Sequence, residues 1–144
     1  MRIKVICIGK TDEGYLKEGI QKFLKRISFY AKAELIELRP EKSRDIAEKI
    51  KSITRGYKIL LDVGVKELSS EQFAALIQER INQGCPEIDF LIGGHSGFPL
   101  PAEEVADLSI SLSRCTFTHQ MIRLLLLEQV YRAFTILQGH PYHK

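Results

Sequence analysis

The sequence predicts an α/β domain built on a mostly parallel β-sheet flanked by helices. Short runs rich in β-branched and aliphatic residues alternate with longer segments in which apolar residues recur at helical spacing. The chain has 144 residues, of which 44% are hydrophobic and 27% are charged, as expected for one globular domain. With no internal repeat and no linker-like stretch, we expect residues 1–144 to form a single domain.

The individual elements follow from this alternation. Five short apolar runs, each bounded by glycine, proline or polar residues, predict strands over residues 3–8, 33–38, 57–63, 88–92 and 108–112. Helical spacing predicts helices over residues 12–27, 43–53, 69–82 and 119–138, with a short turn at 101–104. Thr11 or Asp12 is expected to cap the first helix, Ser43 the second and Ser69 the third.

The last predicted helix carries more apolar residues than a single stripe needs. They are Met121, Ile122, Leu124, Leu125, Leu126, Leu127, Val130, Tyr131, Phe134 and Leu137. A helix that is apolar on two sides requires two covering surfaces. One is expected to be the sheet and the other a second copy of the chain, as in a twofold homodimer. The alternative is a helix buried entirely within one chain.

The net charge is only +3, but its distribution is uneven. Residues 1–33 hold eight Lys or Arg against three acids, residues 34–107 hold nine against fourteen, and residues 108–144 hold four against one. If the two basic ends meet in the fold, they form one positive face suited to a phosphate backbone. The alternative is that these charges belong to ordinary solvated helix faces.

Several classes of protein are excluded at this stage. No run of 18 apolar residues predicts a membrane span, and the N-terminal stretch is too short and too charged for a signal peptide, so we expect a cytoplasmic protein. Cys7, Cys85 and Cys115 are widely separated and odd in number, which predicts reduced thiols. No metal site is expected, because no Cys, Asp or Glu stands at ligand spacing from His140 and His143.

Two segments are candidates for chemistry. Residues 93–97, Gly-Gly-His-Ser-Gly, follow a predicted strand directly, at the edge where open α/β sheets bind ligands. A plain tight turn is the alternative, and His95 is expected to be a loop residue rather than a ligand. The tail, residues 139–144, combines two histidines, a tyrosine and a lysine, which can stack on a base and pair with phosphate. Its alternative is a fraying end.

Three segments taken together are more specific. They are Leu-Ile-Gly-Gly-His-Ser-Gly at 91–97, the stretch 109–133 containing Ser-Arg-Cys-Thr-Phe-Thr-His, and His-Pro-Tyr-His at 140–143. In order and spacing, over the whole chain, they resemble the RlmH family of the SPOUT superfamily of methyltransferases. The resemblance implies a sheet with a deep trefoil knot at its C-terminal end, a homodimer, and S-adenosylmethionine as cofactor. It implies methylation at N3 of a pseudouridine in 23S rRNA, on the large subunit or the assembled ribosome.

The resemblance also implies roles for particular residues. Its cofactor pocket corresponds to Leu61, Gly93, Gly94, Leu112, Ser113, Arg114, Cys115, Thr116, Phe117 and Thr118. On the acceptor side, we expect His143 to handle the proton, Tyr142 to place the base, and Arg132 to stabilise charge or contact phosphate. Arg114, Arg123 and the lysines of the first helix are expected to bind the RNA backbone. In a dimer, the tail of one subunit is expected to complete the pocket of the other.

Two other functions stay open at this stage. One is a non-catalytic RNA-binding or ribosome-assembly module on the same scaffold, which would keep the basic face without the cofactor pocket. The other is an enzyme acting on small nucleotides with a Rossmann-like sheet, although the glycine loop is not the G-x-G-x-x-G fingerprint of such sites.

Overall fold

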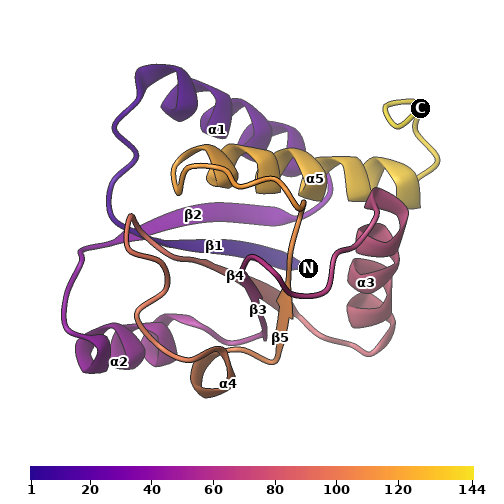
Figure 1. Cartoon of the computed structure of the whole chain (residues 1–144). Coiled ribbons are helices and arrows are strands. Elements are labelled where there is room, and N and C mark those ends of the chain that lie inside the picture. The colour runs from indigo at the N-terminus through magenta and orange to yellow at the C-terminus, as the bar shows by residue number, and fades with distance from the viewer.

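A computed structural model describes all 144 residues, and it confirms the predicted α/β architecture. Five strands form one sheet in the order β2-β1-β4-β3-β5, and every neighbouring pair is parallel. In chain order, the elements are β1 (Arg2–Ile8), α1 (Gly14–Ile27), β2 (Lys32–Leu38), α2 (Ser43–Ile53), β3 (Tyr57–Leu61), α3 (Ser70–Asn82), β4 (Glu87–Ile92), α4 (Ala102–Val105), β5 (Leu108–Ile110) and α5 (Met121–Leu137) (Figure 1).

The molecule has three layers, with helices on both faces of the sheet (Figure 1). The larger core lies between the sheet and the helices α1, α3 and α5, and the smaller core lies between the sheet and α2 and α4. The central strand β4 is buried along its whole length. This is the arrangement expected of a parallel sheet, which helices must cover on both sides. None of the helices has the length and apolarity that crossing a bilayer requires.

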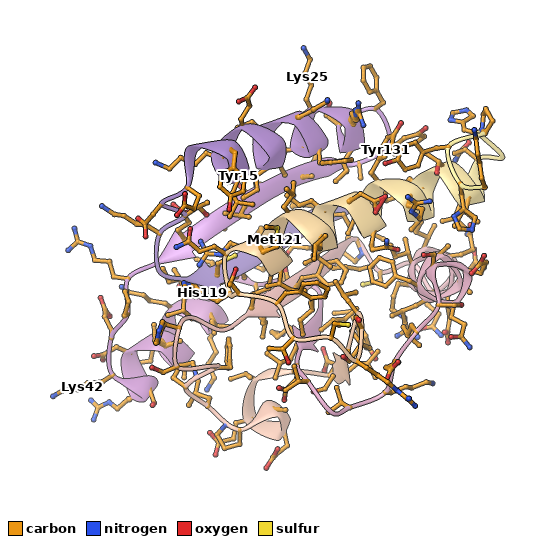
Figure 2. All side chains as sticks on the ribbon, turned by 45° about the horizontal axis from the view of Figure 1, so that its top comes forward. Tyr15, Lys25, Lys42, His119, Met121 and Tyr131 are labelled. Carbon is orange, nitrogen blue, oxygen red and sulfur yellow. The ribbon has the colours of Figure 1, made fainter.

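Helix α5 packs on the sheet between α1 and α3 (Figure 1). No residue of α5 is fully exposed, and seven are buried. The same chain therefore covers α5 on three sides, where the sequence led us to expect a second copy for one of them. Met121 and Tyr131 remain half-buried on α5 (Figure 2).

Some element ends differ from the prediction for tertiary reasons. Ser69 forms the predicted cap, with a reciprocal capping box to Gln72. The prediction of a cap at Thr11 or Asp12 is wrong: α1 begins at Gly14, and neither side chain bonds to its first turn. Ser43 is the first residue of α2 rather than its cap, and its hydroxyl donates to the carbonyl of Pro99. Strands β3 and β5 end two residues earlier than predicted, because the chain turns away there into loops.

A buried acidic cluster lies at the amino-terminal edge of the sheet. Asp89 is fully buried and Glu87 nearly so, and their carboxylates accept the backbone N–H groups of Gly56 (2.9 Å) and Arg55 (2.8 Å). The ammonium of Lys4 lies 3.4 Å from Glu87. Burial, followed by the neighbouring Glu87, raises the pKa of Asp89 to about 6. Near neutral pH the second negative charge of the pair, that of Asp89, is therefore energetically unfavourable.

This cluster predicts a pH-dependent stability that D89N removes. Between its unfolded pKa of about 3.9 and its folded pKa of about 6, Asp89 holds more protons in the folded chain, so stability falls as pH rises through this window. The free energy of unfolding of D89N relative to wild type should therefore increase by about 2 kcal/mol between pH 4 and pH 7. Urea unfolding at pH 4, 5.5 and 7 measures this difference.

The matched control is D107N, which removes an exposed carboxylate that also accepts a backbone N–H, that of Lys58 at 2.8 Å. It separates the effect of burial from the loss of a backbone hydrogen bond. A D89N difference that is the same at all three pH values would contradict the prediction.

Candidate functional site

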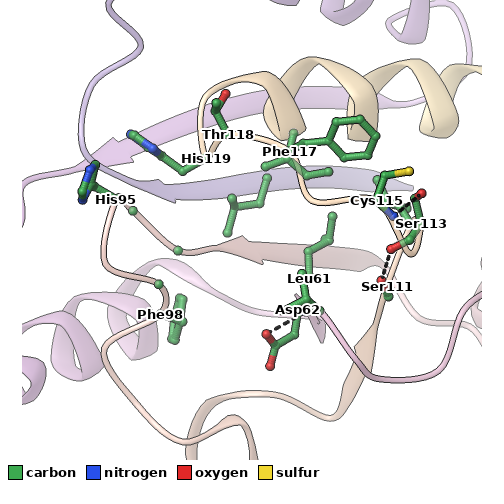
Figure 3. Close-up of a pocket in the computed structure, with 17 residues that line it drawn as sticks. Leu61, Asp62, His95, Phe98, Ser111, Ser113, Cys115, Phe117, Thr118 and His119 are labelled. Atoms are coloured by element: carbon green, nitrogen blue, oxygen red, sulfur yellow. Dashed lines mark hydrogen bonds between the residues drawn. The ribbon is translucent and has the colours of Figure 1, made fainter.

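A cavity of about 460 Å³ opens at the carboxyl edge of the sheet. Its walls come from the loops that follow β3, β4 and β5 and from the first turn of α5 (Figure 3). In a parallel sheet these strand ends all meet at one edge, so segments 61–63, 92–98 and 111–122 converge there although they are far apart in sequence.

Most of the residues expected to hold the cofactor line this cavity. They are Leu61, Gly93, Gly94, Leu112, Ser113, Cys115, Phe117 and Thr118. The structure does not bring Arg114 and Thr116 to the cavity wall. Arg114 is exposed, and its Nε donates to Glu67 at 3.1 Å. Sequence reasoning missed Asp62, whose position directly after β3 is the signal that could have found it.

The glycine loop, residues 93–97, folds back tightly on itself, so its glycines do more than leave space for a ligand. A Cβ on Gly93 would lie 2.4 Å from the carbonyl carbon of Gly97, and one on Gly94 would lie 3.0 Å from the carbonyl oxygen of Ile8. Gly94 and Gly97 exchange two backbone hydrogen bonds, and Gly97 has a φ of +84°. The glycines are thus needed to close the loop and press it against β1, which shapes the cavity mouth.

The cavity offers both apolar and polar contacts. Leu61, Leu112 and Phe117 supply apolar wall, and the backbone N–H groups of Leu112 and Ser113 donate to no other group of the chain. The carboxylate of Asp62 accepts only its neighbour's N–H, at 2.8 Å. Such a lining suits a ligand with a flat apolar ring and a polar remainder.

Two histidines face each other at the cavity mouth (Figure 3). The ring centroids of His95 and His119 are 6.1 Å apart, and neither ring is hydrogen-bonded within the chain. Burial, then the positive charge of Arg123 and the nearby His95, lowers the pKa of His119. The mouth therefore presents a neutral imidazole at physiological pH. His95, expected to be only a loop residue, is part of the cavity lining.

The expectation that Arg123 binds an RNA backbone is wrong, because its side chain is completely buried. Its guanidinium donates to the hydroxyl of Thr11 (2.7 Å) and to the carbonyl of Ile8 (3.0 Å), and it lies 3.4 Å from the carboxylate of Glu37. Arg123 therefore ties the start of α5 to the ends of β1 and β2.

The three residues expected on the acceptor side form one cluster at the other end of α5. The guanidinium of Arg132 donates to Glu128 and lies 3.1 Å from Nδ1 of His143. The Tyr142 hydroxyl donates to the same carboxylate at 3.2 Å, and burial together with Glu128 raises the pKa of that hydroxyl. The tail is thus packed against α5 rather than frayed.

This cluster does not border the cavity of its own chain. Ile122 lines the cavity, whereas Arg132 lies ten residues further along α5, or about 15 Å of helix. A second cavity of about 200 Å³ lies between them. It shares Leu112, Ser113 and Phe117 with the first cavity and extends toward α3 and Gln129.

The two basic ends of the chain do meet, since α1 and α5 pack together. Their combined charge is smaller than the sequence suggests, because Arg123 is buried, Arg132 is paired with Glu128, and Arg114 with Glu67. Lys25 extends into solvent from α1 (Figure 2). The exposed cations of α1 are Lys17, Lys22 and Lys25.

Comparison with known proteins identifies relatives of the whole chain. Residues 1–143 match the family described as "Predicted SPOUT methyltransferase". The chain is 43% identical, over 159 aligned positions covering all of both proteins, to the ribosomal RNA large subunit methyltransferase H of Streptococcus pneumoniae, for example in strains TIGR4 and D39.

Two solved structures share the fold at low sequence identity. One is a probable methylase family protein from Haemophilus influenzae Rd KW20, with a TM-score of 0.58, 11% identity, and coverage of 99% of this chain and 70% of the other. The other is a putative methylase family protein from Neisseria gonorrhoeae, with a TM-score of 0.55, 8% identity, and coverage of 90% and 81%.

The burial of Arg123 predicts a large stability cost for R123M. The substitution leaves the carbonyl of Ile8 and the hydroxyl of Thr11 without a donor, and it leaves Glu37 with only the N–H of Thr11 as a partner. We expect the free energy of unfolding to fall by about 3 kcal/mol, as measured by urea unfolding. The control R114M breaks only an exposed ion pair and should cost less than about 1 kcal/mol. Equal losses in the two variants would contradict the role assigned to Arg123.

Proposed function

The chain belongs to the SPOUT methyltransferase family, and on that premise we propose that it methylates large-subunit ribosomal RNA. The proposed reaction transfers a methyl group from S-adenosylmethionine to N3 of a pseudouridine in 23S rRNA. The observation that carries the proposal is the full-length similarity to the S. pneumoniae ribosomal RNA methyltransferase. Because its substrate would be ribosomal RNA, we also propose that the protein is cytoplasmic.

The residues of the cavity fit this cofactor. The cavity volume of about 460 Å³ is within the range typical of small-molecule sites, roughly 300–1,000 Å³. The free N–H groups of Leu112 and Ser113 can bind polar atoms of the adenosine or methionine part, and Leu61 and Phe117 can cover the adenine ring. When bound, the cofactor supplies a methyl group already activated by its sulfonium charge, so the protein need not activate the donor.

The protein's remaining task lies with the acceptor nitrogen. N3 of a uracil ring carries a proton and becomes a good nucleophile only when that proton leaves. In the proposal His143 handles this proton, Tyr142 places the base, and the positive charge of Arg132 stabilises the negative charge that develops on the ring oxygens. The lysines of α1 contact the RNA backbone.

The trefoil knot is also part of the proposal. Its support is the path of the chain after β5: the N–H of Ser111 donates to the carbonyl of Lys66 at 2.8 Å, and Arg114 pairs with Glu67 at 3.1 Å. The chain then crosses the cavity and enters α5 between α1 and α3. Stretching the unfolded protein from both ends would test it, because a threaded chain extends less than its contour length.

We further propose a homodimer in which the tail of one subunit completes the cavity of the other. Tyr15 and Phe117 are large apolar side chains that are 61% and 41% exposed, and a partner would cover them. The tail cluster lies away from the cavity of its own chain. A second copy can bring the two together.

The function is tested by mass spectrometry of ribosomal RNA after incubation with the protein and isotopically labelled S-adenosylmethionine. Wild-type protein should add one methyl group at N3 of a pseudouridine, with ribosomes as a much better substrate than a short RNA hairpin. H143A should lose most of this activity, by about 100-fold, while cofactor affinity measured by calorimetry stays near normal. Full activity in H143A would remove His143 from the mechanism.

The calorimetric measurement also separates the alternatives. A non-catalytic RNA-binding module would bind ribosomes without binding S-adenosylmethionine, and an enzyme of small nucleotides would be indifferent to ribosomes. Either outcome would contradict the proposed function.

A shared tail predicts that two inactive variants restore activity when mixed. L112W fills the cofactor cavity and keeps the tail, whereas H143A keeps the cavity and lacks the tail histidine. After the subunits exchange at equal amounts, about half of the dimers are mixed and each has one intact site of two, so about a quarter of wild-type activity should return. No recovery from two dimeric variants would show that each tail serves its own chain.

A further inference from the structure

The hydrogen bonds of His143 define its protonation state. Nδ1 lies 3.1 Å from Nη1 of Arg132, and Nε2 lies 2.8 Å from Oε1 of Glu71. A guanidinium can only donate hydrogen bonds, so Nδ1 must be the accepting nitrogen. The ring proton is then on Nε2, which donates to the carboxylate of Glu71. Contacts on both sides therefore select one neutral tautomer, with its basic lone pair on Nδ1.

A second carboxylate orients the guanidinium. Glu128 accepts from Nε of Arg132 at 3.0 Å and from Nη2, and it also accepts the Tyr142 hydroxyl. The guanidinium lies over the Tyr142 ring, 4.9 Å from its centroid. Two of its three nitrogens are thus held by Glu128, and Nη1 is left to face His143. The result is a donor and an acceptor side by side at one edge of the cluster.

We propose that this edge, Arg132 Nη1 beside His143 Nδ1, binds the imide edge of the acceptor uracil ring, with Glu128 and Glu71 as positioning residues. The inference rests on the proposed function and names the atoms that would carry it out. In a uracil ring, N3–H stands between two carbonyl groups. N3–H can donate to Nδ1 while an adjacent carbonyl accepts from Nη1. Without a substrate, donor and acceptor satisfy each other.

The proton and electron count is balanced. The N3–H bond breaks as its proton moves to Nδ1, and the electron pair left on N3 forms the new bond to the methyl group. The methyl–sulfur bond breaks, and its electrons return to sulfur, which becomes a neutral thioether. The imidazolium keeps its Nε2–H bond to Glu71, and the added proton then passes to water.

The surrounding charges agree with these roles. Glu71 from α3 and Glu128 and Arg132 from α5 face His143 directly, and Arg26 from α1 lies near Tyr142. The hydrogen bond from His143 is the main cause that lowers the pKa of Glu71, so this carboxylate is ionised at neutral pH and can stabilise the imidazolium. A cytosine ring, whose N3 is an acceptor, would place a lone pair against the lone pair of Nδ1 and would be rejected.

The experiment reads the tautomer directly. Long-range proton–nitrogen correlation spectra of the full-length protein, labelled on histidine nitrogen, distinguish a protonated from an unprotonated Nε2, and H143Q identifies the signal. Wild type should show the proton on Nε2. E71Q and E71A should both keep that tautomer, because Arg132 still requires Nδ1 to accept, whereas R132M removes this donor and should give a mixture. E79Q, on the same helix, is the matched control and should change nothing.

Kinetics on ribosomes provide the second measurement. Loss of one charge-assisted hydrogen bond should lower kcat roughly 10- to 100-fold in E71A and E128A, with KM for ribosomes and affinity for S-adenosylmethionine changed by less than about threefold. E71Q, which keeps the hydrogen bond but not the negative charge, should recover only part of the loss. Thermal unfolding of each variant shows that it is folded.

The outcomes are distinguishable. A wild-type His143 that carries its proton on Nδ1, an R132M variant with an unchanged tautomer, or an E71A variant with an unchanged kcat would overturn the inference. If wild-type protein methylates no ribosomal RNA, the proposed function fails, while the spectra still decide whether the arrangement of Glu71, His143 and Arg132 exists.

Discussion

The buried guanidinium of Arg123 is the interaction on which the placement of α5 depends. It joins the carbonyl at the end of β1, the hydroxyl of Thr11 and the carboxylate of Glu37 to the first turn of α5. Burying an arginine is costly unless its donors are paired; here both terminal nitrogens are paired and only Nε has no partner, so the geometry favours one position of the helix. Asp12 and Gln120 reinforce it at the surface, where the Asp12 N–H donates to Gln120 at 2.7 Å. The start of α5 is therefore fixed relative to the strand ends that form the cavity.

Because the five strands are parallel, the loops that carry chemistry gather at one edge without help from any single residue. The glycine loop is the second feature that determines the shape of the cavity. A Cβ at Gly93 would collide with the backbone of Gly97 and Phe98, and one at Gly94 would press tightly against Ile8. The loop therefore packs closely on itself and on the end of β1, where it forms one wall of the cavity. The opposite edge carries the Glu87–Asp89 pair, a structural cluster with no part in the site.

Local patterns predicted what local interactions decide. The strands, the helices and the cap at Ser69 follow from short-range spacing, and the two residues of the capping box are only three positions apart. The caps expected at Thr11 and Asp12 failed because Arg123 and Gln120, more than one hundred residues away, take those side chains. Arg123 itself looked like a surface cation, since sequence cannot show that β1 supplies acceptors for it. Family resemblance predicted that the glycine loop and the segment before α5 form the cofactor pocket. It did not predict Glu71 and Glu128, whose contacts with His143 and Tyr142 appear only once the tail is folded against α3 and α5.

Helix α5 connects the cavity to the tail cluster of Arg132, Tyr142 and His143. Its first turn borders the cavity through Ile122 and is anchored by Arg123, and its last turns hold Arg132 against Glu128. A helix of 17 residues is a rigid rod about 25 Å long, so fixing one end fixes the direction in which the other end presents the tail. The separation between cavity and tail cluster is then a set distance rather than slack in a flexible terminus. In the proposed homodimer, a tail held in this way meets the partner's cavity through the placement of the two subunits rather than through motion of the tail.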